Sequence, residues 1–142
     1  MVSAWVSKHR LFLGQVKVDD KSHEITAIPA LLSLLDISGC IITIDAMGTQ
    51  YEIAGRIHKK GADYILALKA NHPTLFQDVK KWFENATVNN FDGIEYSYDV
   101  RVESAHNRQE KRQIWAVSIE QMCGLYKESQ WSGLQTIVKN LT

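Results

Sequence analysis

CIITIDAMGTQYEIAGRIHKKGADYILAL, residues 40 to 68, contains the pattern that decides the fold. Its first six residues, Cys40 to Asp45, are short, β-branched and almost wholly apolar, which predicts a strand buried on both faces as in a parallel sheet. Residues 50–60 carry apolar side chains at helical spacing, end on two lysines and meet Gly61 at the C-cap position, so we expect a helix. Residues 63–68 form a second apolar strand. The order strand, helix, strand predicts a βαβ unit.

The segments before this unit predict a hairpin and a helix. Residues 2–6 and 11–18 are β-rich and are separated by a polar stretch, which favours antiparallel pairing. Thr26 and Pro29 mark the expected start of a helix, and Gly39 its end. We expect the leucines of this helix to be core residues, namely Leu31, Leu32, Leu34 and Leu35.

The segments after the unit change in character. Residues 73–85 predict a helix with an apolar stripe that includes Phe76, Trp82 and Phe83, which fits a core better than a base-stacking platform. A turn-rich stretch follows. The remaining segments alternate polar and apolar residues or are short, and they predict strands at 94–102, 111–118 and 134–138 and a helical stretch at 119–126.

The composition limits the class of protein. With 142 residues, 45% of them apolar, the chain has enough material for the core of a soluble globular domain. Its 16 basic and 16 acidic residues cancel, so a nucleic-acid contact would need a local basic patch. Two cysteines without metal-ligand spacing predict neither a disulfide framework nor a zinc site. No apolar stretch approaches the ~18 residues of a membrane span, so we expect a cytoplasmic protein without membrane contact.

Three motifs, in order, resemble one family. GCIITIDAMGTQ followed by EIAGRIHKKGADYILALKANHPTLFQDV is similar to the second-aspartate region of bacterial insertion-sequence transposases of the H-repeat-associated group. VKVDDKSHEITAIPALLSLLDISG precedes it as in that group, and HNRQEKRQIWAVS resembles its later His-Gly-Arg-x-Glu-x-Arg stretch. Such transposases are DDE enzymes with an RNase H-like fold. The resemblance therefore implies a bacterial protein whose intact relatives cut and rejoin the DNA of transposon ends.

The resemblance implies a catalytic and metal-binding role for Asp45. Enzymes of this kind hold two divalent metal ions, Mg²⁺ or Mn²⁺, between three carboxylates for in-line displacement at phosphorus. Asp45 follows an apolar strand, where open α/β sheets place ligands. The alternative is that Asp45 only caps the helical turn after it.

The other two acidic residues of such a site are not found in this sequence. The family places the first aspartate on a strand before the segment matched here and the glutamate on a later helix. Tyr98 and Arg101 resemble the tyrosine and arginine that precede the glutamate in related transposases, but their spacing does not match. Glu110 alternates with Arg108 and Arg112, as residues on a strand do. Glu110 is thus a weak alternative acid, and we expect this chain to be catalytically incomplete and to bind the metal weakly.

Two basic groups are candidate DNA contacts. Lys69 and Asn71 follow the second parallel strand and would share an edge of the sheet with Asp45. The densest basic cluster of the chain is the second group, which consists of His106, Arg108, Lys111 and Arg112. Arginine pairs well with phosphate, yet charged runs are also typical of ordinary solvated surfaces, and both interpretations stay open.

These observations give one prediction with two alternatives. We expect an α/β, incomplete RNase H-like core at residues 1–85 and a truncated β-rich insertion at residues 86–142. The alternatives to a transposase fragment are a remnant that binds DNA or transposase without catalysis, and a decayed reading frame. Because a central strand would be missing, we expect either pairing of residues 2–6 with residues 41–44 or an open sheet edge that forms a homo-oligomer.

Overall fold

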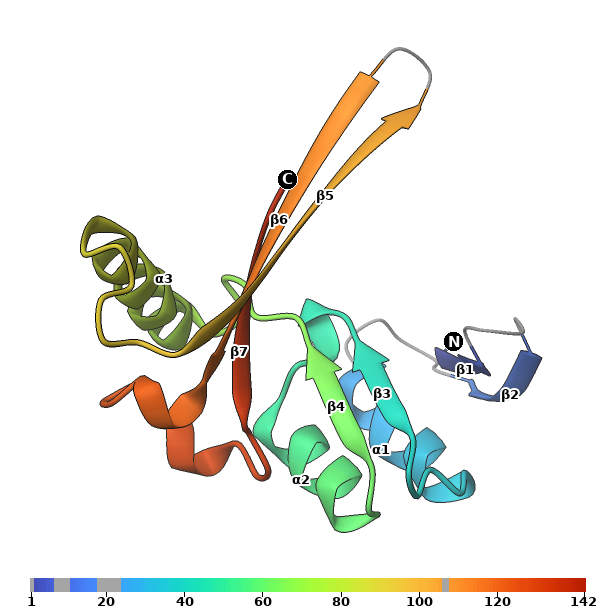
Figure 1. Cartoon of the computed structure of the whole chain (residues 1–142). Helices are drawn as coiled ribbons and strands as arrows, with labels where there is room; N and C mark the ends of the chain where they lie inside the picture. Colours follow the sequence, from blue (N-terminus) through green and yellow to red (C-terminus); the bar gives the residue numbers. More distant parts are fainter. Residues whose placement is uncertain (1, 7–10, 18–23, 106–107) are drawn as a thin grey trace. The chain divides into compact units, whose positions relative to one another are not determined.

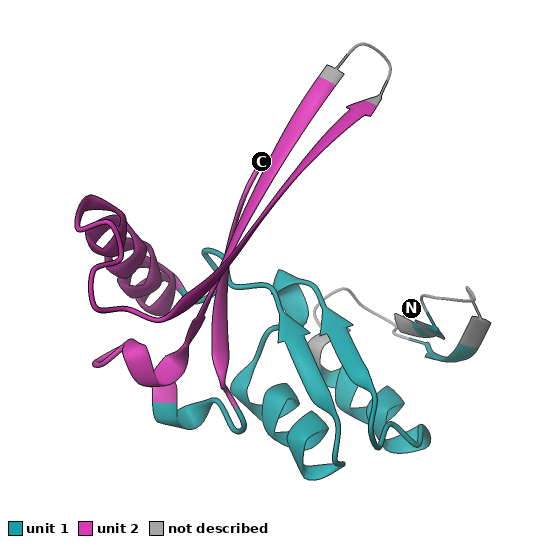
Figure 2. Ribbon diagram, in the orientation of Figure 1, with its two compact units in different colours: residues 1–72, 129–133 teal, residues 73–128, 134–142 magenta. Residues whose placement is uncertain are grey.

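The computed structural model describes residues 2–6, 11–17, 24–105 and 108–142 (Figure 1). The chain forms two compact units, one of residues 1–72 with 129–133 and the other of residues 73–128 with 134–142 (Figure 2). Each unit is described by itself below. The boundary predicted between residues 85 and 86 stays a prediction. No helix in the described part of the chain is long and apolar enough to cross a membrane.

The first unit begins with a strand pair and a helix. Strands β1 (Val2–Val6) and β2 (Leu11–Val16) pair antiparallel, which confirms the predicted pairing. Helix α1 (Glu24–Leu34) begins before the predicted start, and Pro29 lies inside it. Pro29 lies beyond the first turn and has no N–H to donate to the carbonyl of Ile25, so α1 contains one position without its backbone hydrogen bond. The helix also ends before Gly39, which takes a φ of +73° in the turn that follows.

The βαβ unit is present as predicted. Strand β3 (Ile41–Ile44) continues through a turn into helix α2 (Tyr51–Lys59) and then strand β4 (Asp63–Leu66), and β3 and β4 pair in parallel. Gly61 ends α2 at a φ of +74°, a conformation that glycine adopts without steric cost. Among the described strands β3 pairs with β4 alone, so the expected pairing with residues 2–6 does not occur.

The prediction that β3 is buried on both faces is wrong. Side chains alternate between half-buried and exposed along both strands. Ile41 is 65% exposed and Ile65 is 62% exposed, whereas Ile42 and Ile44 pack against the core. Helices α1 and α2 cover only one face of this sheet, as Figure 1 shows. Strands β3 and β4 therefore carry more apolar side chains than are buried among the described residues.

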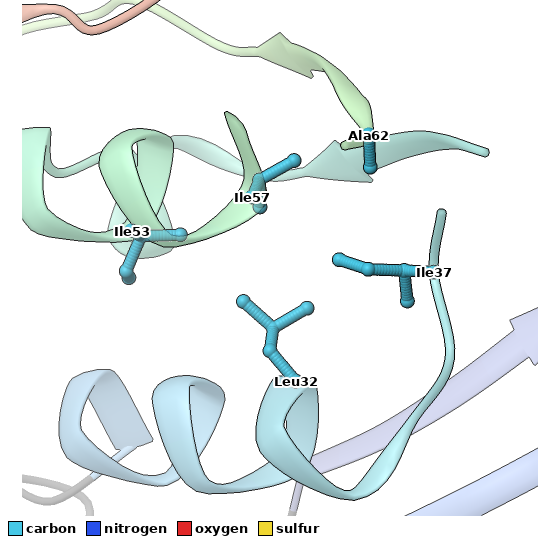
Figure 3. Close-up of a cluster of buried hydrophobic side chains, with 5 residues drawn as sticks. All are labelled: Leu32, Ile37, Ile53, Ile57 and Ala62. Atoms are coloured by element: carbon cyan, nitrogen blue, oxygen red, sulfur yellow. The ribbon is translucent and has the colours of Figure 1, made fainter. Parts of the chain in front are cut away.

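The core of the first unit lies between α1, α2 and the covered face of the sheet. Leu32, Ile37, Ile53, Ile57 and Ala62 are buried there and point toward one another (Figure 3). Burying such side chains contributes about 1.5–3 kcal/mol each for the larger ones. Leu31 is also buried, but the prediction for Leu34 is wrong because it is 73% exposed. Helical spacing alone does not explain this exposure, because Leu34 lies one turn after the buried Leu31 at the last position of α1.

Lys60 joins α1 to α2. Its ammonium group donates hydrogen bonds to the carbonyl oxygens of Leu32, at 2.5 Å, and Leu35, at 2.7 Å. These carbonyls lie at the end of α1, where a helix has no internal donors and a negative dipole end. The sequence predicts Lys60 at the end of its own helix, and the structure shows that it also stabilises the end of its neighbour.

The second unit combines a helix with an antiparallel sheet. Helix α3 (Pro73–Val88) runs three residues beyond its predicted end and buries Leu75 and Phe83, while Phe76 and Trp82 are half-buried. Strands β5 (Tyr96–Ala105), β6 (Arg108–Ser118) and β7 (Thr136–Leu141) form a sheet in the order β5-β6-β7. Instead of the helix predicted at residues 119–126, there are only 3₁₀ turns at Ile119–Gln121 and Glu128–Gln130.

Candidate active-site edge of the parallel sheet

Asp45 lies at the carboxyl end of β3 and its residue is exposed. The backbone there is extended, and the carboxylate accepts a hydrogen bond from the N–H of Gly48 at 3.4 Å, so Asp45 caps the 3₁₀ turn Ala46–Gly48. This bond is long and uses one carboxylate oxygen. Asp45 thus caps the turn and is still exposed to solvent.

The turn after Asp45 is packed tightly. Thr49 is 2% exposed, and its hydroxyl donates to the Asp45 carbonyl at 2.9 Å. Gly48 is buried against two isoleucines: a Cβ built on it would lie 2.7 Å from Ile28 Cδ1 and would overlap Ile44 Cγ2. Only glycine fits at this position without a shift of its neighbours. The turn therefore holds the backbone of Asp45 in one place.

Two residues after β4 hold this turn from the other side. The Asn71 amide donates to the Ala46 carbonyl at 2.5 Å, and its oxygen accepts from the backbone N–H of Lys69 at 3.1 Å. His72 Nε2 lies 2.6 Å from the Thr49 carbonyl. A carbonyl oxygen only accepts, so this ring nitrogen carries the proton. Asn71 is therefore occupied as a positioning residue for the Asp45 turn, while Lys69 is exposed at the same edge.

An aromatic cluster supports His72. The rings of Tyr51 and Trp131 lie 5.3 Å and 5.2 Å from its ring, and they lie 4.8 Å from each other. Trp131 is 6% exposed, and its Nε1 has no hydrogen-bond partner. The sequence offers no signal for this cluster, because Trp131 comes from a turn-rich segment far along the chain. Nearby, the Tyr64 hydroxyl donates to the Ser132 carbonyl at 2.9 Å, and burial raises the pKa of Tyr64.

The second basic group lies on the β5–β6 hairpin. Lys111 and Arg112 are both exposed, but as neighbours on one strand they project from opposite faces of the sheet. Arg108 begins β6 and has the same parity as Arg112; its side chain and all of His106 lie outside the described residues. The four predicted DNA contacts therefore do not share a single face.

Glu110 lies on strand β6 of the second unit. It lies directly opposite Glu103 in the β5–β6 register and is exposed. The part of the chain that the structure describes contains no group of three His, Cys, Asp or Glu side chains suited to hold a metal ion. These residues by themselves do not fit a two-metal centre.

The βαβ unit and the position of Asp45 at the end of β3 define the class of protein. The parallel pair β3–β4 with its connecting helix is typical of α/β proteins, whose ligands commonly bind at the carboxyl ends of the strands, where Asp45 lies. The family model described as "Transposase DDE domain" matches residues 1–126, so the chain belongs to the transposase DDE domain family. No solved structure matches it.

A curated relative named as an H-repeat-associated putative transposase agrees with this assignment and with the resemblance to that group. The chain is 44% identical over 112 residues to "H repeat-associated putative transposase YbfD" of Escherichia coli, covering 79% of this chain and 43% of the relative. It is 40% identical over 138 residues to "Uncharacterized protein in dhlA 3'region" of Xanthobacter autotrophicus, covering 97% and 45%. The chain thus spans less than half the length of these relatives.

Proposed function

We propose that this chain forms part of an RNase H-like DNA transposase in which Asp45 is one of the carboxylates that bind Mg²⁺ or Mn²⁺. The observation that carries the proposal is the exposed Asp45 at the carboxyl end of a parallel strand, in a member of the DDE domain family. Asn71 and His72 hold the turn after Asp45, which suits a ligand that must keep its geometry.

The chain alone is proposed to be catalytically incomplete. Two metal ions need several bridging carboxylates to offset their repulsion, and the described residues contain no group of three His, Cys, Asp or Glu side chains suited to hold a metal ion. The same lack of a metal-ligand group supports the alternative, a remnant that binds DNA or transposase without catalysis. A supercoiled plasmid incubated with the purified chain and Mn²⁺ should remain unnicked. Nicking that disappears in Asp45→Asn would contradict incompleteness and make Glu110 the first acid to test.

Metal binding at Asp45 is tested without activity. Mn²⁺ is paramagnetic and broadens the NMR signals of nearby amides, so we expect selective broadening at residues 45–49 and Asn71. Asp45→Asn is the matched variant, because its side-chain oxygen still accepts from Gly48 N–H while the charge is gone. A single carboxylate binds a hard cation weakly, so the broadening should require about millimolar Mn²⁺. Equal broadening in wild type and variant would overturn the assignment of Asp45.

DNA contact is proposed at Lys69 and at Arg112 on strand β6, while His106 and Arg108 stay candidates from the sequence. Phosphate contacts are mainly electrostatic, so binding should weaken steeply with salt. Arg112→Gln should lower the affinity for DNA. It should also reduce the slope of log affinity against log salt concentration by about one, because one fewer phosphate is neutralised. Lys111→Gln is the matched control, because Lys111 projects from the opposite face. An equal loss in both variants would mean that neither face is the contact surface.

A further inference from the structure

Strand β5 is a long edge strand of the described three-stranded sheet. It pairs with β6 over ten residues in a continuous register, and the described strands place nothing on its other side. Every side chain from Tyr96 to Ser104 is exposed. Alternate N–H and C=O groups of such a strand point outward without partners, and proteins usually protect them with charged side chains, Pro or a bulge. The sequence YSYDVRVESA contains no Pro and no Lys, and its register has no bulge.

The exposed side chains of β5 divide into two faces. Tyr96, Tyr98, Val100 and Val102 alternate on one face and are 46%, 47%, 44% and 61% exposed. The opposite face carries Ser97, Asp99, Arg101 and Glu103. One strand thus offers an apolar ladder on one face and charges of both signs on the other. This combination suits a partner strand with the same alternation.

We propose that a second copy of this chain pairs its β5 antiparallel to this one, with Val100 opposite Val100 of the copy. In that register Asp99 faces Arg101 of the copy and Arg101 faces Asp99, so both contacts join opposite charges. Tyr98 faces Val102 on the apolar face in the same reciprocal way. Cross-strand apolar pairs and opposite charges stabilise a sheet, and a two-fold axis gives each contact twice. The proposal does not depend on the proposed function.

Neighbouring registers of the same two-fold pairing are poorer. Centring on Asp99 places two aspartates opposite each other, and centring on Arg101 does the same with two arginines. Centring on Val102 joins Arg101 to Glu103 of the copy, but it aligns fewer residues of the two strands. The Val100 register is the one that satisfies both charges and keeps the longer overlap. The intrachain contact between Arg101 and Asp99, at 3.1 Å, joins exposed groups that can exchange it for the partner.

Charge reversal tests the register. Arg101→Asp should place a carboxylate opposite Asp99 of the copy at both contacts, and Asp99→Arg should pair two cations in the same way. Each variant should weaken association by roughly hundredfold, because like charges are brought together twice. Mixing the two variants should restore the dimer as a heterodimer, since each then offers what the other lacks. The double variant Asp99→Arg/Arg101→Asp should also restore it.

Sedimentation of the full chain over a range of concentrations measures this. The wild type should have twice the mass of either single variant, and mixing should recover the larger mass. Glu103→Arg is the control, because Glu103 faces Ser97 of the copy in the Val100 register but Arg101 in the Val102 register; its mass should equal that of the wild type. A wild-type mass that Arg101→Asp leaves unchanged, or loss of the dimer in Glu103→Arg, would overturn the proposal.

Discussion

Alanine at position 48 would place a methyl group where the structure has no room. The added Cβ would lie 2.7 Å from Ile28 Cδ1 and overlap Ile44 Cγ2, and both side chains are held by the core of the first unit. Overpacking of this kind costs about 1–3 kcal/mol. Gly48→Ala should therefore lower the free energy of unfolding by that amount, and the Tm by roughly 4 °C per kcal/mol for a chain of this size. Chemical and thermal unfolding followed by circular dichroism measure both quantities.

Two further variants separate crowding from a general effect of alanine. Gly55 lies inside α2 and an added Cβ meets nothing within 4 Å, so Gly55→Ala should stabilise the chain by about 0.5–1 kcal/mol. Ile44→Ala removes the methyl group that the new Cβ would overlap. The double variant Ile44→Ala/Gly48→Ala should therefore lose at least about 1 kcal/mol less unfolding free energy than the two single variants lose in sum. Strict additivity, or a Gly48→Ala chain as stable as wild type, would refute the steric argument.

Three other variants test particular contacts. Lys60→Met should cost about 1–3 kcal/mol, because two charged hydrogen bonds to the end of α1 are lost, whereas exposed Lys59→Met should change stability by less than about 0.5 kcal/mol. Asn71→Ala should speed amide exchange at residues 48 and 49; unchanged exchange would show that the turn does not need this side chain. Burial raises the pKa of Tyr64 above 10.0, so its neutral hydroxyl contributes fully to the free energy of unfolding below pH 10.0. This contribution is lost as the pH rises through the pKa of Tyr64 in the folded chain. The stability advantage over Tyr64→Phe should therefore shrink above pH 10, and an advantage that grows there would contradict burial of the hydroxyl.

The parts of the fold that follow from local patterns are predictable from the sequence. The βαβ unit is encoded by apolar runs and by Gly61, whose left-handed backbone ends α2 at the predicted position. Asp45 is predicted at the end of its strand by the same local pattern. Errors arise where two local rules compete: Pro29 usually marks a helix start, but one more turn forms before it.

The support of the candidate site is not predictable in this way. Trp131 reaches His72 through the tertiary fold, and no periodicity or motif relates the two positions. Asn71 looks like a phosphate contact in the sequence because it is polar and follows a strand. In the structure its amide is committed to the carbonyl of Ala46. Side-chain hydrogen bonds to backbone depend on distances that only the folded chain sets.

The exposed face of the β3–β4 sheet shows what the sequence encodes beyond the described contacts. Ile41 and Ile65 lie on this face, although parallel sheets are normally covered on both sides and a two-stranded sheet is at best marginal in water. The apolar run around β3 therefore fits a strand in a larger sheet with a second layer. Relatives of which this chain spans 29% to 45% have additional polypeptide for such a layer. If that polypeptide covers the equivalent face in the relatives, the proposal for Asp45 predicts that the other acids of the proposed metal site lie at the edge of the sheet that Asp45 marks.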